Sequence, residues 1–270
     1  MARPLSEIKP TYRRDAIRRL GVALWLGLLT TGFCHAATLV KVGGYPFPPF
    51  VETNTGQHSG LTLELIELFN QHQTEFKLEY VHTSPKRRYS DFDEKRFDVL
   101  FFESKVWGWG EYPVDASDVF LTGGEVYIAN RKRGHQQSYF DKLDNKRLVG
   151  VLGYHYGFAG FNADTDFLMQ HFDIRLVSTP ESILKRITSD KSDVGVITLA
   201  YLNAQTLTDP ELKARILVSD KMDQEYQHTI LVRRNGKVSV DHFNAWLKAL
   251  KQNGKLKALF SRYNLQDNME

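Results

Sequence analysis

Aromatic side chains are the residues of this sequence best suited to recognising a small molecule. In the run VWGWG at 106–110, two large rings alternate with glycines, so they can project from an unencumbered loop. The run GYHYG at 153–157 and a proline-rich loop at 45–50 supply further rings. Such rings could sandwich a planar or cationic group. The rings singled out are Tyr45, Phe47, Trp107, Trp109, Tyr154 and Tyr156.

Each of these rings also has a purely structural interpretation. The prolines of the loop at 45–50 could simply stiffen a turn while Phe47 and Phe50 fill the core. Either tryptophan could pack beneath its own loop. His155, which lies between the two tyrosines of the second run, could be a solvated loop histidine instead of a ligand contact.

Charged residues close to the rings offer a second kind of chemistry. Glu103 could accept a ligand ammonium group and Lys105 could hold a carboxylate, or the two could pair with each other. Arg88 ends the basic run at 86–88, which could lie on the surface or bring a guanidinium to a binding site.

The sequence lacks the motifs that most classes of enzyme need. The sequence contains no GxSxG motif, no phosphate-binding loop and no dinucleotide fingerprint. Its histidines show no paired spacing of the kind that metal ligands have. We therefore expect no catalytic residue, no metal and no cofactor.

The first 36 residues have the three-part plan of a secretory signal. Arginines at 13–19 precede an apolar run at 20–33, and Ala36 allows cleavage before Ala37. The apolar run is short for a bilayer span, although a signal anchor is the alternative. Location in the periplasm follows from this prediction.

Removal of this segment would change the charge and the redox chemistry of the chain. It carries six basic and two acidic residues, so the net charge would fall from +3 to −1. The mature protein would then have no electrostatic case for binding nucleic acid. The only cysteine, Cys34, would also be lost, leaving no disulfide.

Apolar strands alternate with helical stretches along the remaining chain, which predicts an α/β fold with mainly parallel sheets. We expect strands at 39–42, 76–81, 98–103, 124–130, 148–152, 174–177, 194–198 and 229–233. We expect helices at 61–71, 88–92, 161–171, 180–188, 240–252 and 255–263.

The strand, aromatic loop and helix at 39–71 resemble the opening of the family 3 bacterial extracellular solute-binding proteins. Further landmarks are similar to that family and occur in the same order. They are FDV at 97–99, DASD at 115–118, NKRLVGV at 145–151, SDVGV at 192–196 and a closing helix pair at 248–263.

The resemblance implies the type II periplasmic-binding-protein fold, with two lobes, two crossovers and a ligand cleft between the lobes. It places a signal peptide at 1–36, the first part of lobe one at 37–123 and lobe two at 124–223. Residues 224–270 then return to lobe one with the C-terminal helices. Closure would be a hinge motion near 121–125 and 220–226.

Within that cleft the resemblance implies a set of ligand contacts. Phe47 would lie against the ligand with Tyr45 close by, and Arg88 would stand at the cleft mouth. Glu103 and Lys105 would line the cleft together with the tryptophan and tyrosine rings.

The family's usual clamp for an α-amino acid is missing from the sequence. Its arginine would fall at Gly110, and its carboxylate would fall near Thr198, which we retain as a candidate contact. The ordinary grip on an amino acid is therefore in doubt.

The function implied is a non-enzymatic, monomeric periplasmic receptor of an ABC-type uptake system, which binds a small polar or aromatic, amino-acid-like solute. Its partner would be a membrane permease or a membrane sensor. One alternative is a periplasmic enzyme similar to cyclohexadienyl dehydratases, with Glu103, Lys105 and Arg88 as its polar groups. Another is a ligand-sensing receptor for a membrane signalling protein.

Overall fold

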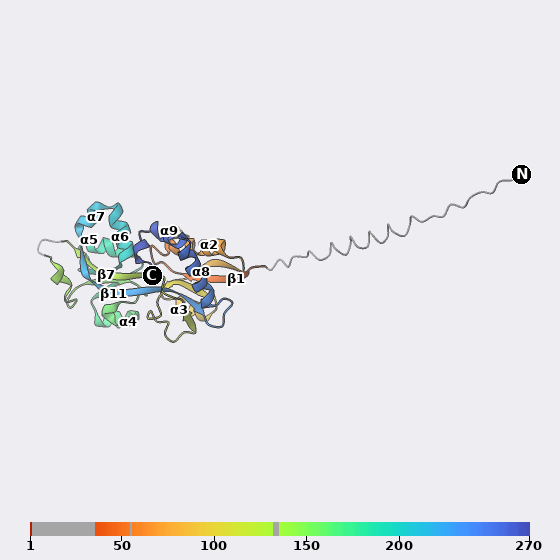
Figure 1. The fold of residues 1–270 in the computed structure, drawn as a ribbon. Helices are drawn as coiled ribbons and strands as arrows, with labels where there is room; N and C mark the ends of the chain where they lie inside the picture. The colour runs from red at the N-terminus through yellow and green to blue at the C-terminus, as the bar shows by residue number, and fades with distance from the viewer. Residues whose placement is uncertain (2–35, 55, 132–134) are drawn as a thin grey trace. The chain divides into compact units, whose positions relative to one another are not determined.

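Two long antiparallel strands, β7 (Leu121–Asn130) and β11 (Ile216–Arg233), lie side by side at the centre of the sheet order in the computed structural model (Figure 1). The structure describes residue 1 and residues 36–54, 56–131 and 135–270. The strand order is β4-β1-β5-β11-β7-β10-β8-β9, and β6 also pairs with β11. We call the part built on β4, β1 and β5 lobe one, and the part built on β10, β8 and β9 lobe two.

Parallel pairs make up each lobe, whereas antiparallel pairs join them. In lobe one, β1 is parallel to β4 and β5; in lobe two, β8 is parallel to β9 and β10. The remaining strands are β1 (Thr38–Gly44), β2 (Glu52–Asn54), β3 (Gln57–Ser59), β4 (Phe76–His82), β5 (Val99–Glu103), β6 (Val114–Ala116), β8 (Leu148–Val151), β9 (Ile174–Val177) and β10 (Val194–Thr198).

Helices cover the sheets by their apolar faces. The helices are α2 (Leu61–His72), α3 (Arg88–Asp93), α4 (Thr165–His171), α5 (Pro180–Thr188), α6 (Leu199–Thr208), α7 (Pro210–Arg215), α8 (Val240–Gln252) and α9 (Lys255–Ser261). On α8, the predicted stripe of Phe243, Trp246, Leu247 and Leu250 is buried. The Phe243 ring packs edge-on against Phe69 of α2, so this stripe belongs to the core of lobe one, as predicted.

Helix starts follow the capping residues. Thr179 accepts a hydrogen bond from the Ser182 amide and Pro180 occupies the first turn, so α5 begins where the sequence indicates. The helix expected from 161 begins at Thr165 instead. Asp164 is its cap, and Phe161 has a φ of 62° that no helix allows.

The sequence interpretation missed several elements. It left out the β2–β3 hairpin, strand β6 and the two helices α6 and α7. Helix α6 begins directly after β10 without a side-chain cap, so no local signal separates strand from helix. In α7, Asp209 caps the first turn and Pro210 follows it, a start signal that the prediction overlooked.

The predicted signal segment at 1–36 lies outside the described residues except for its two end positions. Among the helices of the described ranges, none has the length and apolarity needed to cross a membrane. The lobe boundaries at 123 and 223 stay a prediction. Residues 37–270 together form one compact unit.

Candidate functional site

A small cavity lies between the lobes and is lined by residues from both. Its volume is about 20 Å³, which holds about one water molecule. Its walls are Tyr45, Phe47, Arg88, Trp107, Glu125, Tyr154, His155 and Gln224. The structure therefore brings five of the ten predicted site residues into one place.

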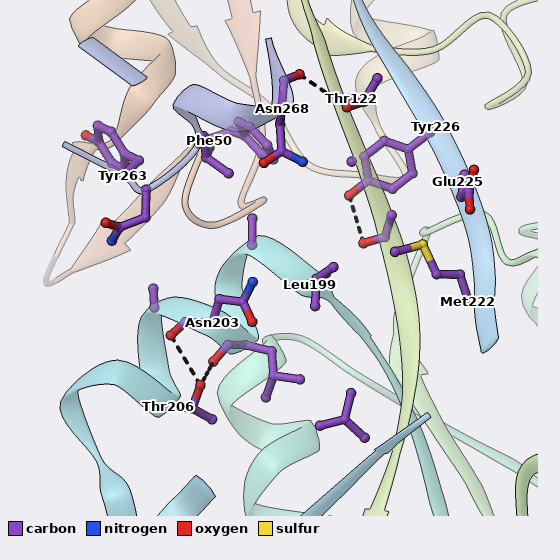
Figure 2. A pocket seen from close by; sticks show the side chains of 18 of the residues that line it. Phe50, Thr122, Leu199, Asn203, Thr206, Met222, Glu225, Tyr226, Tyr263 and Asn268 are labelled. Carbon is purple, nitrogen blue, oxygen red and sulfur yellow. Dashed lines mark hydrogen bonds between the residues drawn. The ribbon is translucent and has the colours of Figure 1, made fainter. Parts of the chain in front are cut away.

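A larger cavity of about 1120 Å³ lies beside the hinge strands (Figure 2). Its lining includes Phe50 and Tyr263 from lobe one, Asn203 from α6, and Tyr226 from β11. The Tyr226 ring lies 4.9 Å from the ring of Trp107, centroid to centroid and edge-on. Because Trp107 lines the small cavity and Tyr226 the large one, this ring pair separates the two spaces.

Arg88 lies inside the closed cleft, so its predicted place at the cleft mouth is wrong. Its side chain is 2% exposed, and Nε lies 3.2 Å from Oε1 of Glu103, whose side chain is fully buried. One terminal nitrogen donates to the carbonyl oxygens of Pro85 at 2.6 Å and Gly153 at 3.3 Å. Burial acts to lower the pKa of Arg88, but Tyr45 and Glu103 raise it on balance, so the guanidinium stays charged.

Glu103 lies behind Arg88 and does not line the cavity. It pairs with Arg88 instead of Lys105, whose side chain is exposed. Burial raises the pKa of Glu103 against the opposing effect of Arg88. Of the predicted charged contacts, only Arg88 therefore reaches the cavity.

Three more predicted residues lie outside the small cavity. Trp109 is fully buried in lobe one, with its ring 5.5 Å from that of Phe92. The Tyr156 hydroxyl hydrogen-bonds to the backbone of Val151, which fixes a turn in lobe two. Thr198 is buried and its hydroxyl donates a hydrogen bond to Glu125, described below.

The backbone at Gly108 explains why the two tryptophans separate. Its φ of 79° is in the left-handed region, which glycine adopts without strain. A side chain there would meet the hydroxyl of Tyr89 at 2.9 Å. The resulting turn places Trp107 at the cavity and Trp109 in the core.

Glu125 is a cavity residue that the sequence analysis missed. It is 3% exposed, and the Thr198 hydroxyl donates to its Oε1 at 2.9 Å. Burial raises its pKa to about 8; the hydrogen bond from Thr198 opposes this shift and the nearby Asp223 adds to it. The sequence did contain a signal that could have identified it, because Glu125 is the only charged residue of the predicted crossover at 121–125.

Gln224 is the second missed residue and comes from the other predicted crossover. Its Oε1 accepts a hydrogen bond from Nε1 of Trp107 at 3.1 Å, and its Nε2 donates to the carbonyl oxygen of His155. Gln224 thus contacts both Trp107 of lobe one and the loop of lobe two that contains His155.

His155 completes the wall as a neutral imidazole. Burial and Arg88 lower its pKa to about 3. A terminal nitrogen of Arg88 lies 3.3 Å from Nδ1 of His155, and a guanidinium can only donate. Nδ1 therefore accepts, the proton lies on Nε2, and Nε2 faces the Tyr89 hydroxyl at 3.4 Å.

Direct contacts between the lobes close the cleft. The Tyr154 hydroxyl of lobe two donates to the carbonyl oxygen of Pro46 in lobe one at 2.9 Å. The Tyr154 ring also meets the ring of Phe47 edge-on at 5.5 Å. With the Arg88 contacts to Gly153 and His155, these interactions leave no room for an amino acid, so a solute can enter only when the lobes separate.

Within the ranges that the structure describes, no group of three or more histidine, cysteine, aspartate or glutamate side chains could hold a metal ion. The side chains that line the cavity carry one guanidinium, one carboxyl, one amide and one imidazole, besides two phenol hydroxyls and one indole N–H. This set can bind a charged or hydrogen-bonding solute between aromatic walls.

Solved structures with a similar fold include binding proteins that hold amino acids. A putative ABC-transporter binding component from Wolinella succinogenes, complexed with lysine, has a TM-score of 0.66 and 15% identity, covering 83% of this chain and 94% of that one. A substrate-binding protein of an ABC uptake transporter from Streptococcus pneumoniae, with bound histidine, has a TM-score of 0.69 and 14% identity, covering 86% and 94%.

A third similar structure is an ancestral amino acid-binding protein described as a precursor of cyclohexadienyl dehydratase. Its TM-score is 0.63 at 20% identity, covering 83% of this chain and 95% of that one. At such identities the likeness shows the fold, which is the two-lobed type II fold with a ligand cleft, as predicted. The comparison with curated proteins found no match.

The family described as bacterial extracellular solute-binding proteins, family 3, matches residues 40–266. This match covers nearly all of the chain that follows the predicted signal, and it agrees with the two-lobed fold and the interlobe cavity. The chain therefore belongs to the family 3 bacterial extracellular solute-binding proteins.

Proposed function

We propose that this protein is a periplasmic receptor that closes over a small polar or aromatic, amino-acid-like solute and delivers it to an ABC-type permease. The observation that carries the proposal is the cavity between the lobes, where Arg88 and Glu125 stand among aromatic rings. A buried carboxyl together with other polar groups between aromatic rings suits a small solute with a charged or hydrogen-bonding group.

Membership of an extracellular family supports a location outside the cytoplasm. A signal peptide at 1–36 with cleavage before Ala37 would direct the chain to the periplasm. In that setting the mature receptor would work as a monomer and present its closed form to the permease. A membrane sensor would be an equally suitable docking partner for a closed receptor.

One feature of the structure supports the alternative that the protein is a dehydratase. Elimination of water needs a carboxylic acid beside the substrate, and Glu125 provides a buried carboxyl in the cavity whose pKa is about 8. Against it, Arg88 is already paired with Glu103, which leaves no free cation for a substrate carboxylate. Turnover of prephenate or arogenate by the purified protein would establish this alternative in place of the receptor.

A thermal-shift screen of residues 37–270 tests the receptor proposal. The compounds are amino acids, amines, short peptides and aromatic acids. A ligand at 100 times its Kd adds about 2.7 kcal/mol of stability, which raises Tm by about 5–10 °C in a chain of this size. A flat screen across all four classes contradicts the proposal.

Two variants test whether a ligand that raises Tm binds in the cavity. Tyr154→Phe removes the hydroxyl that reaches Pro46 across the cleft and should change the shift that the ligand produces. Lys105→Ala alters an exposed side chain outside the cavity and serves as the control. Equal shifts for both variants and the wild type would place the ligand elsewhere.

A further inference from the structure

The two charged side chains that line the small cavity differ in how far the protein already satisfies them. Each of the three nitrogens of the Arg88 guanidinium faces a polar group of the protein. Nε faces the Glu103 carboxylate at 3.2 Å, one terminal nitrogen donates to two carbonyl oxygens, and the other faces Nδ1 of His155 at 3.3 Å. A solute carboxylate would have to replace these contacts to bind Arg88.

Aromatic rings also cover the Arg88 guanidinium. Its central carbon lies 4.8 Å from the ring centroid of Tyr45 and 4.6 Å from that of Tyr89. Both distances are typical of cation–π contacts. The positive charge of Arg88 is therefore balanced by Glu103 and further stabilised by the two rings.

Glu125 has the opposite surroundings. Among the described residues its hydrogen-bond donor is the Thr198 hydroxyl, and the negative charge of Asp223 adds to the effect of burial in raising its pKa. Among the described residues, no ion pair to Glu125 occurs within 4.0 Å. A buried carboxylate without a cation is costly, and its raised pKa shows that the proton is retained instead.

The rings around this carboxyl group form a site for a positive charge. Phe47, Trp107 and Tyr154 line the same cavity as Glu125, and Glu125 adds to the effect of burial in raising the pKa of Tyr154 and of Tyr226. Trp107 packs edge-on against Tyr226 at 4.9 Å, and Tyr154 packs edge-on against Phe47 at 5.5 Å. Ring faces attract ammonium groups, and a carboxyl beside them can supply the counter-charge.

We propose that the solute recognised in this cleft is an organic amine, whose ammonium group pairs with Glu125 among the rings of Phe47, Trp107 and Tyr154 and which needs no carboxylate group. This inference rests on the proposed receptor function. The ammonium enters when the lobes separate, and Glu125 gives its proton to solvent as the ion pair forms. Arg88 then serves to hold the lobes together and does not act as a carboxylate clamp.

Matched pairs of amino acids and their decarboxylated amines test the proposal by calorimetry on residues 37–270. The pairs are arginine and agmatine, lysine and cadaverine, histidine and histamine, and tyrosine and tyramine. At least one amine should bind ten times more tightly than its parent amino acid. Its binding should release protons, seen as a heat that depends on the ionisation enthalpy of the buffer.

Glu125→Gln keeps the shape of the side chain but cannot ionise, and should weaken amine binding at least tenfold. Glu211→Gln changes an exposed carboxylate of α7 and is the matched control. If Glu125→Gln does not fold, the proton release by the wild type still decides the question.

The outcomes separate this inference from the receptor function. An amino acid that binds as tightly as its amine, or amine binding without proton release, overturns the amine inference and leaves the receptor intact. Binding of peptides or aromatic acids alone does the same. No binding by any compound class overturns both.

Discussion

Arg88 Nε lies 3.2 Å from Oε1 of Glu103, and the two buried side chains join the start of α3 to the end of β5. Removal of one partner from a buried ion pair leaves an uncompensated charge, which typically costs about 3–5 kcal/mol. The closed cleft depends on this pair because Arg88 also reaches Gly153 of lobe two.

Glu103→Gln should therefore lower the free energy of unfolding by about 3–5 kcal/mol, measured by urea denaturation. Asp115→Asn is the control, because Asp115 and Arg234 form an ion pair whose side chains are about half exposed. Exposed pairs contribute about 0–1 kcal/mol. Equal losses for the two variants would contradict the role assigned to the buried pair.

Glu125 should make the protein less stable as the pH rises. Its pKa is about 8 in the fold against an ordinary value of 4.5, so between these values the folded chain holds a proton that the unfolded chain has lost. The contribution to stability is complete below pH 4.5 and is lost as the pH rises through 8.

Glu125→Gln removes this dependence. The Tm of the variant minus that of the wild type should increase between pH 5 and pH 8.5 by at least about 2–4 °C, the shift that about 1 kcal/mol causes in a chain of this size. Glu211→Gln should show no such trend. A difference that is constant with pH would mean that Glu125 is ionised in the closed form.

The sequence could show that a carboxyl was missing near Thr198, but not where its replacement lies. In the structure, Thr198 and Glu125 are direct cross-strand partners of the antiparallel pair β10 and β7. Pairing of residues 73 positions apart is set by sheet register, which no local spacing reveals. The neighbouring strand β7 thus places the carboxyl of Glu125 beside Thr198.

Strands and helices with clear periodicity were predictable, whereas the burial of charged residues was not. The sequence left open whether Arg88 lies on the surface or at the mouth of the cleft, and its burial follows from its contacts with the opposite lobe. Likewise, nothing local distinguishes Trp107 from Trp109. Their separation depends on the left-handed backbone of Gly108 and on the elements packed around it.

His228 should make the protein sensitive to acid. It lies fully buried in β11 with its ring 4.6 Å from that of Phe50, and burial lowers its pKa to about 3 against a weaker opposing effect of the Phe102 backbone. The folded chain keeps this imidazole neutral, while the unfolded chain binds a proton below pH 6.5. Stability present above pH 6.5 is thus lost as the pH falls toward 3.

His228→Phe fits the surrounding rings and cannot titrate. Its free energy of unfolding should fall between pH 7 and pH 4.5 by about 2–3 kcal/mol less than that of the wild type. His155, with its similarly lowered pKa, would account for part of the remaining acid sensitivity. His171→Gln changes an exposed ring and should follow the wild type. If the free energy of unfolding of His228→Phe depends on pH as steeply as that of the wild type, His228 does not cause the acid sensitivity.

The contacts across the cleft should keep the lobes together without a solute. Gln224 links Trp107 to the carbonyl oxygen of His155, and Tyr154 links its own loop to Pro46. The double variant Gln224→Leu, Tyr154→Phe removes these hydrogen bonds while it keeps most of the apolar volume. The balance should then shift toward separated lobes, because the contacts of Arg88 with Gly153 and His155 would have to hold the closed form without these hydrogen bonds.

Small-angle scattering of residues 37–270 measures this shift. A closed chain of this length should have a radius of gyration of about 17–18 Å, and the double variant should have a larger one. Tyr80→Phe is the control, since its hydroxyl bonds to the carbonyl oxygen of Gly44 within lobe one. If the double variant stays as compact as the control, packing of rings such as Phe47 on Tyr154 holds the cleft closed and the hydrogen bonds do not.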